Sequence, residues 1–439
     1  MEREIFEDLL KWKESDTKKP LLLRGARQVG KTYIVRKLGR LFSNFVEVNF
    51  ESEPEISSFF KGNLLPDNIC SKLSVYYNDS IIDGKTLLFF DEIQACPEAI
   101  KSLRFFYERR PNLHVIAAGS LLEFALKNLS SFGVGRIRSL FMYPLSFNEF
   151  LKAAGKDSLL KIKLSSSIKN RQDEIFHKKL TEMFVKFLII GGMPEVVSTY
   201  LKTDDITQTQ RVLDDIITSL EDDFAKYSKR VNIARLKDIF MSILFQTGTK
   251  FNITGSSVSG NFEQKKEALE MLVMAGLCYK VYHSSANGVP LAAEKNEKKF
   301  KIIFFDTGIL QRSLHLKLGD FLVADSLEMI NKGNIVEQYV GLEYVKACHR
   351  FTKPELFYWQ REKRGSSAEV DYLIEKNNKI IPVEVKSGIH GKMQSLFMFL
   401  KLKQHTNGIR TSLENFNSYS NIDVYPVYAI DNLFSEILE

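Results

Sequence analysis

One stretch near the beginning of the sequence has the residue types and spacing that hold a chain of phosphates. Residues 25–32 read Gly-Ala-Arg-Gln-Val-Gly-Lys-Thr, which matches the pattern G-x-x-x-x-G-K-[ST]. An apolar run typical of a strand precedes it, and a segment typical of a helix follows it. Backbone N–H groups of such a loop and helix start point at phosphates. In this pattern Lys31 reaches the β- and γ-phosphates, and Thr32 offers its hydroxyl to Mg²⁺. The residues expected to bind ATP are therefore Gly25, Ala26, Arg27, Gln28, Val29, Gly30, Lys31 and Thr32.

Two adjacent acids lie at the end of a continuous apolar run. Residues 86–90 read Thr-Leu-Leu-Phe-Phe, the pattern of a central parallel strand, and Asp91 and Glu92 follow them. Ligands of parallel sheets bind at the carboxyl ends of the strands, so both acids are expected beside the phosphate loop. We assign Asp91 to Mg²⁺, directly or through water, and Glu92 to the attacking water. The alternative is a solvated strand end.

Two further residues are candidates for the same chemistry. Residues 114–120 read as a buried strand that ends in Ser120, whose hydroxyl could sense the γ-phosphate or position water. A serine at a strand end is also a common turn residue. Arg136 follows a Gly/Ser-containing stretch and could act on the γ-phosphate of a neighbouring subunit, which would require a homo-oligomer. The alternative for Arg136 is an ordinary surface cation.

A second group of chemically competent residues lies near the C-terminus. Two apolar-patterned runs flank Asn377-Asn378, which predicts a hairpin with a two-residue turn that pairs Lys376 with Lys379. Counting outward, Asp371 falls opposite Glu384 on one face of the hairpin. Such a pair could hold a second Mg²⁺ or Mn²⁺, which lowers the pKa of bound water and polarises a phosphate.

Taken together, the N-terminal motifs resemble a family of prokaryotic AAA-type ATPases whose C-terminal region is catalogued as domain of unknown function 4143. The resemblance covers nearly the whole chain and implies ATP binding. The family usually has threonine before the Gly-Ser of the strand at 114–120, but this chain has Ala118. If that threonine is the sensor, Ala118 cannot replace it and hydrolysis would be slow. The motifs that carry the resemblance are the loop at 25–32, Phe-Phe-Asp-Glu-Ile-Gln at 89–94, Ala-Gly-Ser at 118–120, Gly-Arg at 135–136, Tyr-Pro-Leu-Ser-Phe-Asn-Glu-Phe at 143–150, Gly-Gly-Met-Pro-Glu at 191–195 and Phe-Asp-Thr-Gly-Ile-Leu at 305–310.

The C-terminal spacing Asp-x₁₂-Glu-x-Lys resembles the PD-(D/E)xK nuclease superfamily. Its lysine is Lys386, which is two residues after Glu384 and therefore shares its face. Glu337, in a helical stretch, matches the acid that this superfamily often supplies from a preceding helix. The resemblance implies a nuclease-like site of Glu337, Asp371, Glu384 and Lys386. A Lys–Glu cross-strand pair can also be structural, and nuclease-like folds also persist as inert binding modules.

The segment between these motifs is mostly helical in its periodicity. Residues 156–230 place apolar side chains at four-residue steps, as in a helical lid or connector. Residues 231–320 have the pattern of a winged helix, with two amphipathic helices followed by two strands around a polar loop. Such a domain could bind double-stranded DNA, although winged helices also pack on their own ATPase or on a partner. The candidate phosphate contacts are Lys265, Lys266, Lys295, Lys298 and Lys299.

The bulk properties are those of a multidomain globular protein. The chain has 439 residues, of which 44% are hydrophobic, and its longest apolar runs are far below the ~20 residues that span a bilayer. We therefore expect no membrane segment. The four cysteines are scattered and the N-terminus lacks a signal-peptide pattern, so we expect a cytoplasmic protein. The net charge of +7 permits nucleic-acid contact but does not demand it.

These observations predict an α/β multidomain protein. It begins with a P-loop AAA-type parallel sheet with helices at 1–155, followed by a helical connector at 156–230 and a winged-helix domain at 231–320. A PD-(D/E)xK nuclease-like α/β domain follows at 321–439. The predicted function is an AAA-type ATPase that hydrolyses ATP with Mg²⁺ and binds or acts on DNA. One alternative is an ATP-gated, metal-dependent DNA endonuclease. The other is a nucleotide-switched DNA- or protein-binding regulator with an inactive nuclease-like domain.

Overall fold

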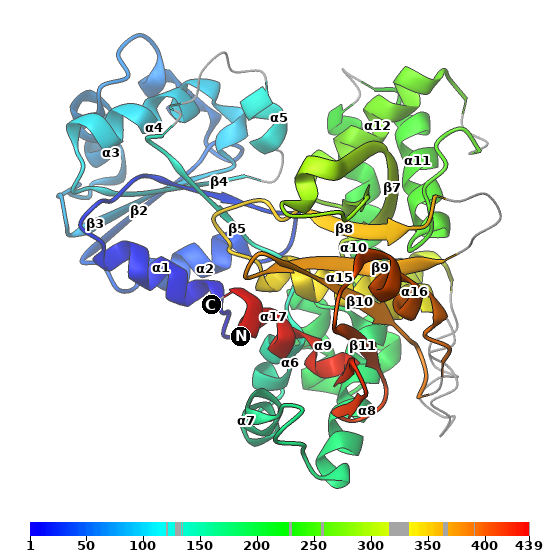
Figure 1. Ribbon diagram of the computed structural model, residues 1–439. Coiled ribbons are helices and arrows are strands. Elements are labelled where there is room, and N and C mark those ends of the chain that lie inside the picture. The colour runs from blue at the N-terminus through cyan, green and yellow to red at the C-terminus, as the bar shows by residue number, and fades with distance from the viewer. Residues whose placement is uncertain are drawn as a thin grey trace. The chain divides into compact units, whose positions relative to one another are not determined.

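The chain folds into two compact units, each with its own β-sheet. The N-terminal unit comprises Glu2–Tyr143 and Arg350–Lys353, and the C-terminal unit comprises Met1, Pro144–His349 and Pro354–Glu439. The computed structural model (Figure 1) describes residues 1–119, 122–127, 133, 135–227, 231–255, 259–315, 333–362, 368–389 and 391–438.

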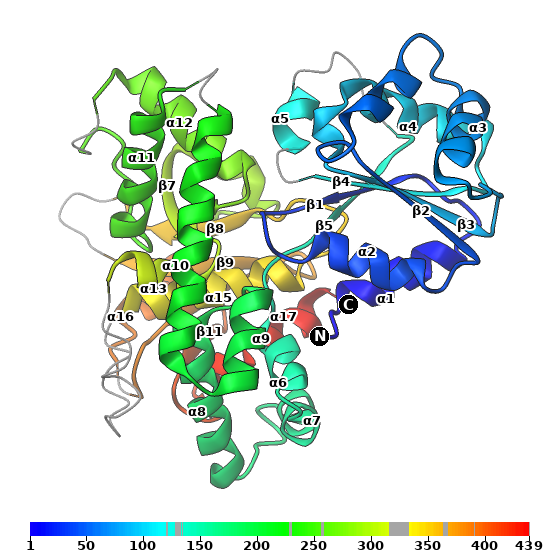
Figure 2. The same ribbon diagram turned by 180° about the vertical axis from the view of Figure 1, so that it is seen from behind.

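A parallel five-stranded sheet forms the centre of the N-terminal unit, with strand order β2-β3-β4-β1-β5. Strands β3 and β4 are buried along their whole length, as their continuous apolar sequences predict. Helices α1 and α2 cover one face of the sheet, and α3 and α4 cover the other (Figures 1 and 2). The AAA-type parallel sheet expected from the sequence is thereby confirmed. The elements are α1 Ile5–Glu14, β1 Leu21–Arg24, α2 Lys31–Gly39, β2 Asn44–Asn49, η1 Pro54–Phe60, α3 Pro66–Tyr77, β3 Thr86–Asp91, η2 Ile93–Ala95, α4 Pro97–Arg109, β4 His114–Ala118, α5 Leu122–Lys127 and β5 Arg138–Phe141.

Four residues from much later in the chain also belong to the N-terminal unit. The backbone N–H of Phe141, at the end of edge strand β5, donates to the carbonyl oxygen of Arg350 at 2.8 Å. The guanidinium of Arg350 pairs with Glu4 at 2.7 Å and with Asp8 at 3.0 Å. The chain therefore leaves this unit, returns to it at Arg350–Lys353 and leaves it again.

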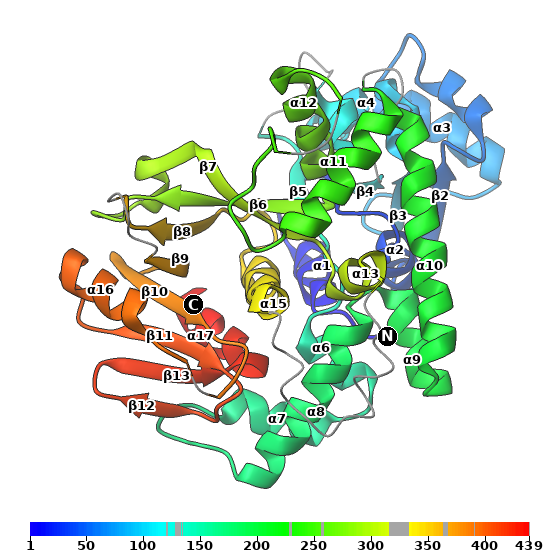
Figure 3. The same cartoon turned by 90° about the vertical axis from the view of Figure 1, so that its right-hand side faces the viewer.

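A mixed eight-stranded sheet forms the centre of the C-terminal unit, in the order β12-β13-β11-β10-β9-β8-β6-β7. Helix α15 lies on one face of this sheet and α16 on the opposite face (Figure 3), while α17 packs against α15. The elements are α6 Phe147–Ala153, α7 Asp157–Ser165, α8 Glu174–Ile190, α9 Pro194–Thr203, α10 Ile206–Asp223, η3 Phe224–Tyr227, α11 Ile233–Gln246, α12 Phe262–Met274, β6 Cys278–Ser284, η4 Leu291–Glu294, β7 Lys295–Phe304, α13 Thr307–Ser313, α15 Gly333–Ala347, β8 Leu356–Gln360, β9 Glu369–Lys376, β10 Lys379–Val385, α16 Gln394–Lys403, β11 Gly408–Ser412, β12 Asn417–Tyr419, β13 Ile422–Pro426, η6 Val427–Ala429 and α17 Ile430–Leu438.

The hairpin of β9 and β10 has the register that the sequence predicts. Lys376 pairs with Lys379 across the turn. The two turn residues, Asn377-Asn378, have φ angles of +48° and +62°, as a two-residue hairpin turn requires. Continued one step beyond its last pair, this register brings Asp371 opposite Glu384.

The helices and strands predicted for residues 231–320 are present as α11, α12, β6 and β7. Strand β6 pairs antiparallel with β7, as in a wing, but it also pairs parallel with β8. The β6–β7 hairpin is therefore the edge of the eight-stranded sheet, and strands from both sides of residue 320 share that sheet.

Three segments that carry the family resemblance meet inside the C-terminal unit. The Oδ2 atom of Asp306 accepts a hydrogen bond from the backbone N–H of Gly192 at 2.7 Å. The carbonyl of Gly192 in turn accepts from the backbone N–H of Leu145 at 2.7 Å. A Cβ added to Gly308 would lie 2.2 Å from the carbonyl oxygen of Ile190, so this close approach requires glycine. These segments form a packed backbone junction.

Candidate functional site

The phosphate loop lies between β1 and α2 and adopts a conformation that few residues tolerate. Gly25 and Gly30 have φ angles of +144° and +98°, and Gln28 has +62°. A Cβ added to Gly25 would lie 2.1 Å from the carbonyl oxygen of Met142. Helix α2 begins at Lys31, so its N-terminal N–H groups follow directly on the loop. The first glycine of the motif is therefore required by both backbone conformation and close packing.

Lys31 is buried and forms hydrogen bonds to backbone oxygens of its own loop. Its Nζ donates to the carbonyl oxygens of Gly25 at 3.0 Å and Ala26 at 2.8 Å. Burial lowers the pKa of Lys31 to about 8, against the opposing effect of Glu92 and Asp91. An ammonium that is costly to bury suits a ligand that brings negative charge, such as a triphosphate.

The two residues assigned to Mg²⁺ lie side by side. The Oγ1 atom of Thr32 donates to Oδ2 of Asp91 at 2.8 Å. Asp91 is only 3% exposed, and burial raises the pKa of its carboxyl group. A hydroxyl and a carboxylate at this distance provide the oxygen donors that Mg²⁺ prefers. The residues therefore fit the cofactors that the loop implies.

Glu92 is oriented by Gln94, a residue to which the sequence analysis gave no role. The Nε2 atom of Gln94 donates to Oε2 of Glu92 at 2.5 Å. Glu92 itself has a φ angle of +47°, which is uncommon for a residue other than glycine. A Cβ added to Gly119 would lie 1.9 Å from Oε1 of Gln94, so this glycine makes room for the amide. The motif Phe-Phe-Asp-Glu-Ile-Gln contains Gln94, but its spacing does not reveal the contact.

Arg3 is a second residue that sequence reasoning missed. The residue is 8% exposed, and its guanidinium donates to the carbonyl oxygens of Val29 at 2.9 Å and of Tyr143 at 2.6 Å. Through these two hydrogen bonds Arg3 links the phosphate loop to the segment after β5. No motif signals this contact, because the partners are backbone atoms far away in sequence.

Three further residues were considered for the nucleotide site, and the structure describes two of them, Ala118 and Arg136. Ala118 is buried in β4 and pairs in register with Leu23, directly before the phosphate loop. Ser120 lies outside the described residues. Arg136 forms an ion pair with Glu108 of α4, with half of its side chain exposed. A role for Arg136 on a neighbouring subunit would require this pair to open.

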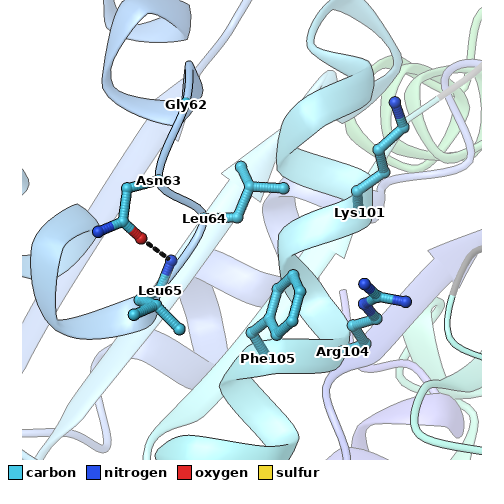
Figure 4. Close-up of a pocket in the computed structure, with 7 residues that line it drawn as sticks. All are labelled: Gly62, Asn63, Leu64, Leu65, Lys101, Arg104 and Phe105. Carbon is cyan, nitrogen blue, oxygen red and sulfur yellow. Dashed lines mark hydrogen bonds between the residues drawn. The ribbon is translucent and has the colours of Figure 1, made fainter.

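A pocket of about 540 Å³ in the N-terminal unit lies between α4 and the loop before α3 (Figure 4). It combines apolar side chains with two cations from α4. None of its residues belongs to the phosphate loop or to the acidic pair, so this pocket is separate from the candidate nucleotide site. Its lining residues are Gly62, Asn63, Leu64, Leu65, Lys101, Arg104 and Phe105.

In the C-terminal unit the carboxylates meet around a lysine that the sequence did not identify. The Nζ atom of Lys301, on β7, lies 2.8 Å from Oε1 of Glu337 on α15 and 3.8 Å from Oδ1 of Asp371 on β9. Lys301 also forms an ion pair with Glu369, two residues before Asp371. Its ammonium lies 5.1 Å from the centre of the Tyr358 ring, and the residue is 1% exposed.

The other two predicted residues lie in the same cluster. The Nζ atom of Lys386 is 2.6 Å from Oε1 of Glu384. The backbone N–H of Val385 donates to Oδ2 of Asp371 at 2.7 Å, which holds the two strands' acids together. The structure thus brings together all four residues of the predicted nuclease-like site, with Lys301 and Glu369 added.

Charges within this cluster perturb one another strongly. Burial, with a contribution from Asp371, raises the pKa of Glu337 to about 8 and the pKa of Glu384 to about 7. Burial opposes the charge on Lys301, but the acids around it outweigh burial and raise its pKa well above its usual value. Within the described part of the chain, no group of three or more acidic, histidine or cysteine side chains is arranged to hold a metal ion.

The lysines considered for DNA contact are mostly engaged or covered. Lys265 is buried. The Nζ atoms of Lys295 and Lys299 lie 3.1 and 2.6 Å from glutamate carboxylates. Lys266 and Lys298 are exposed. The polar loop therefore presents fewer uncompensated charges than its sequence suggests.

Three protein-family models match consecutive parts of the chain. A model described as an AAA domain matches residues 17–151. The N-terminal region is therefore similar to AAA domains. Models of two domains of unknown function, numbered 8612 and 4143, match residues 181–319 and 332–430. The predicted family combination of an AAA domain with domain 4143 is thereby confirmed, and domain 8612 is an addition to it. No curated protein matches the sequence.

Several solved structures are similar to parts of the chain, at low sequence identity. The Walker-type ATPase PABY2304 of Pyrococcus abyssi is 17% identical, with a TM-score of 0.45, and the match covers 71% of this chain and 95% of that one. The Orc1 protein of Aeropyrum pernix, solved in complex with DNA, is 12% identical, with a TM-score of 0.27 and coverage of 73% and 92%. Cdc6p from Pyrobaculum aerophilum is 12% identical, with a TM-score of 0.25 and coverage of 72% and 92%. Because these TM-scores are low, the assignment of the ATPase domain depends on the family model and the site geometry.

Membrane insertion is not indicated by any helix that the structure describes, since none combines enough length with enough apolar character to cross a bilayer.

Proposed function

We propose that the protein binds ATP with Mg²⁺ in its AAA domain and hydrolyses it. The observation that carries this proposal is the contact between Thr32 and Asp91 at 2.8 Å, next to the buried ammonium of Lys31. It supports a site in which Lys31 provides a cation for the phosphates, while the adjacent Thr32 and Asp91 at the end of β3 provide ligands for the metal.

Each residue has a distinct part in the proposed mechanism. The Nζ atom of Lys31 exchanges its loop carbonyls for the β- and γ-phosphate oxygens. Thr32 and Asp91 would hold Mg²⁺, and the ion would supply positive charge beside the phosphates. Glu92 accepts a hydrogen bond from the attacking water and polarises it, and Gln94 fixes the orientation of that carboxylate.

The substitution Glu92→Gln tests this mechanism, because it keeps the size and hydrogen bonding of the side chain but removes the base. We expect ATP affinity to stay within about threefold of the unmodified protein while turnover falls on the order of 10²-fold or more. Phosphate release and binding of a fluorescent ATP analogue measure the two effects separately. Glu98→Gln, which changes an exposed acid on α4, is the matched control and should alter neither. Undiminished turnover in the Glu92 variant would contradict the assigned role.

We also propose that Arg136 completes the site of a neighbouring copy. This role is supported by its half-exposed side chain at the end of the loop before β5. In that case Arg136→Ala lowers turnover only at protein concentrations where the chain assembles, which activity measured against concentration would reveal. A turnover that does not depend on concentration in either protein would argue against it.

Binding of double-stranded DNA is a further proposal, supported by the net charge of +7 and by exposed Lys266 and Lys298. Electrophoretic mobility of a duplex with and without ATP tests it. Since most other candidate lysines are buried or ion-paired, we expect weak binding with a shallow dependence on salt. Tight, ATP-dependent binding would require a DNA surface elsewhere on the chain.

A further inference from the structure

We propose that Lys301 is the built-in cation of the C-terminal carboxylate cluster: its ammonium takes the place among Glu337, Glu369 and Asp371 that a divalent metal ion would need. The cluster is then an internal ion-pair network, and the chain as it stands neither binds a divalent ion there nor cleaves nucleic acid with it.

The first support for this inference is the position of the ammonium. Lys301 comes from β7, while its partners come from α15 and β9. Strand β7 is the edge of the sheet and is separated from β9 by β6 and β8. The side chain crosses the Tyr358 ring to reach the acids and is 1% exposed. A lysine at the surface gains little stability from contact with acids, whereas a buried lysine must be ion-paired.

The second support is the spacing of the oxygens. The Nζ atom of Lys301 lies 2.8 Å from Oε1 of Glu337, which is the usual length of a charge-assisted hydrogen bond of about 2.7–2.9 Å. Mg²⁺ requires oxygens at about 2.0–2.1 Å in near-octahedral geometry. The acids are therefore arranged around an ammonium, and a metal could enter only by displacing it.

The third support is that both lysines of the cluster are already engaged by its carboxylates. Lys386 is engaged with Glu384 at 2.6 Å, so the motif lysine and the motif glutamate also neutralise each other. One observation argues instead for a metal ion at the cluster. The Oε2 atom of Glu384 is buried and has no hydrogen-bond partner among the described residues. This atom is the natural ligand of a competing metal ion and provides the test.

The test is a titration of the full chain, without nucleotide, with Mn²⁺ followed by its electron paramagnetic resonance signal. We expect the unmodified protein to bind no Mn²⁺ tighter than about 1 mM at the cluster. The variant Lys301→Met removes the ammonium and keeps the length of the side chain, and it should gain a Mn²⁺ site at least about tenfold tighter. Lys299→Met, which removes an exposed ion-paired lysine from the same strand, is the matched control and should bind like the unmodified protein.

A second substitution identifies the ligands and keeps the proposal open to refutation. Adding Glu384→Gln to Lys301→Met should abolish the gained Mn²⁺ site, because the carboxylate oxygen without a hydrogen-bond partner is then lost. If Lys301→Met does not fold, the unmodified chain still decides. Mn²⁺ binding by that chain in the micromolar range, lost in Glu384→Gln alone, would overturn the proposal. The absence of nucleotide makes this result independent of ATP hydrolysis.

Discussion

The molecule contains two deeply buried lysines with opposite surroundings. Lys31 in the phosphate loop makes hydrogen bonds to two backbone carbonyls, and burial lowers its pKa to about 8. Lys301 in the C-terminal cluster is paired with carboxylates, and those charges raise its pKa well above its usual value. For Lys31 the cost of burial outweighs the attraction of Glu92 and Asp91, whereas for Lys301 the attraction of the surrounding acids outweighs the cost of burial.

This difference indicates which of the two sites awaits a charged ligand. A buried charge that the fold does not compensate destabilises the free protein and is relieved by a ligand of opposite sign. A charge that is already ion-paired contributes little binding free energy to such a ligand, because binding would first have to break the existing ion pairs. The charge at the phosphate loop thus favours binding of an anionic ligand. The charges of the C-terminal cluster instead form ion pairs that stabilise the fold.

The largest expected effect is the loss of stability when the compensated lysine is removed. Lys301→Met leaves three acids around an apolar side chain, and we expect the free energy of unfolding to fall by about 3–5 kcal/mol. The exposed control Lys299→Met should change it by less than about 0.5 kcal/mol. Urea unfolding followed by far-ultraviolet circular dichroism compares the two variants. Equal unfolding midpoints for the two variants would show that the ion pairs of Lys301 do not stabilise the fold.

The next effect concerns ATP affinity, and it should not be accompanied by a loss of stability. Lys31→Met removes the cation that faces the phosphates, so we expect ATP to bind on the order of 100-fold more weakly. The unfolding midpoint of the nucleotide-free protein should not fall, because the substitution removes a charge whose burial is costly. Isothermal titration with a non-hydrolysable ATP analogue and a thermal melt supply both values. If the melting temperature of Lys31→Met fell as far as that of Lys301→Met, the two lysines would not differ in their effect on stability.

The smallest effect is a pH dependence of ATP binding. The pKa of Lys31 in the free protein is about 8, and bound phosphates raise it. Affinity should therefore be at its full value below about pH 7 and fall as pH rises above 8, by at most about tenfold per pH unit. Near pH 8.5, binding should take up protons, which titrations in buffers of different ionisation enthalpy would detect. The Lys31→Met variant, which lacks the group, should show neither effect in this range.

Much of the candidate nucleotide site is predictable from the sequence because its residues are local. The loop, its glycines and the strand-end Asp91 follow from motif spacing and from an apolar run. The C-terminal hairpin register follows equally well, since a two-residue turn fixes every pair beyond it. These are cases in which residues close in sequence determine the geometry.

Contacts between distant segments were not predictable. Lys301 reaches the cluster from an edge strand that pairs through β6 and β8, and irregularities in the ladder at Tyr282 and Phe357 alter the path across the sheet. Arg3 donates to the carbonyl oxygens of Val29 and Tyr143, which lie far from it in sequence and which no spacing rule links to it. The strands expected for a wing were found, but their membership in a larger sheet depends on long-range pairing.

The return of Arg350–Lys353 to the N-terminal unit has a consequence for cleavage of the chain. A protease that cuts after Tyr143 breaks one covalent link, but the four-residue segment still joins the two units. Both fragments should stay together through the hydrogen bond to Phe141 and the ion pairs of Arg350. An N-terminal unit shortened at residue 143 would also lose the segment that covers the edge of β5, leaving that strand open to pairing between molecules.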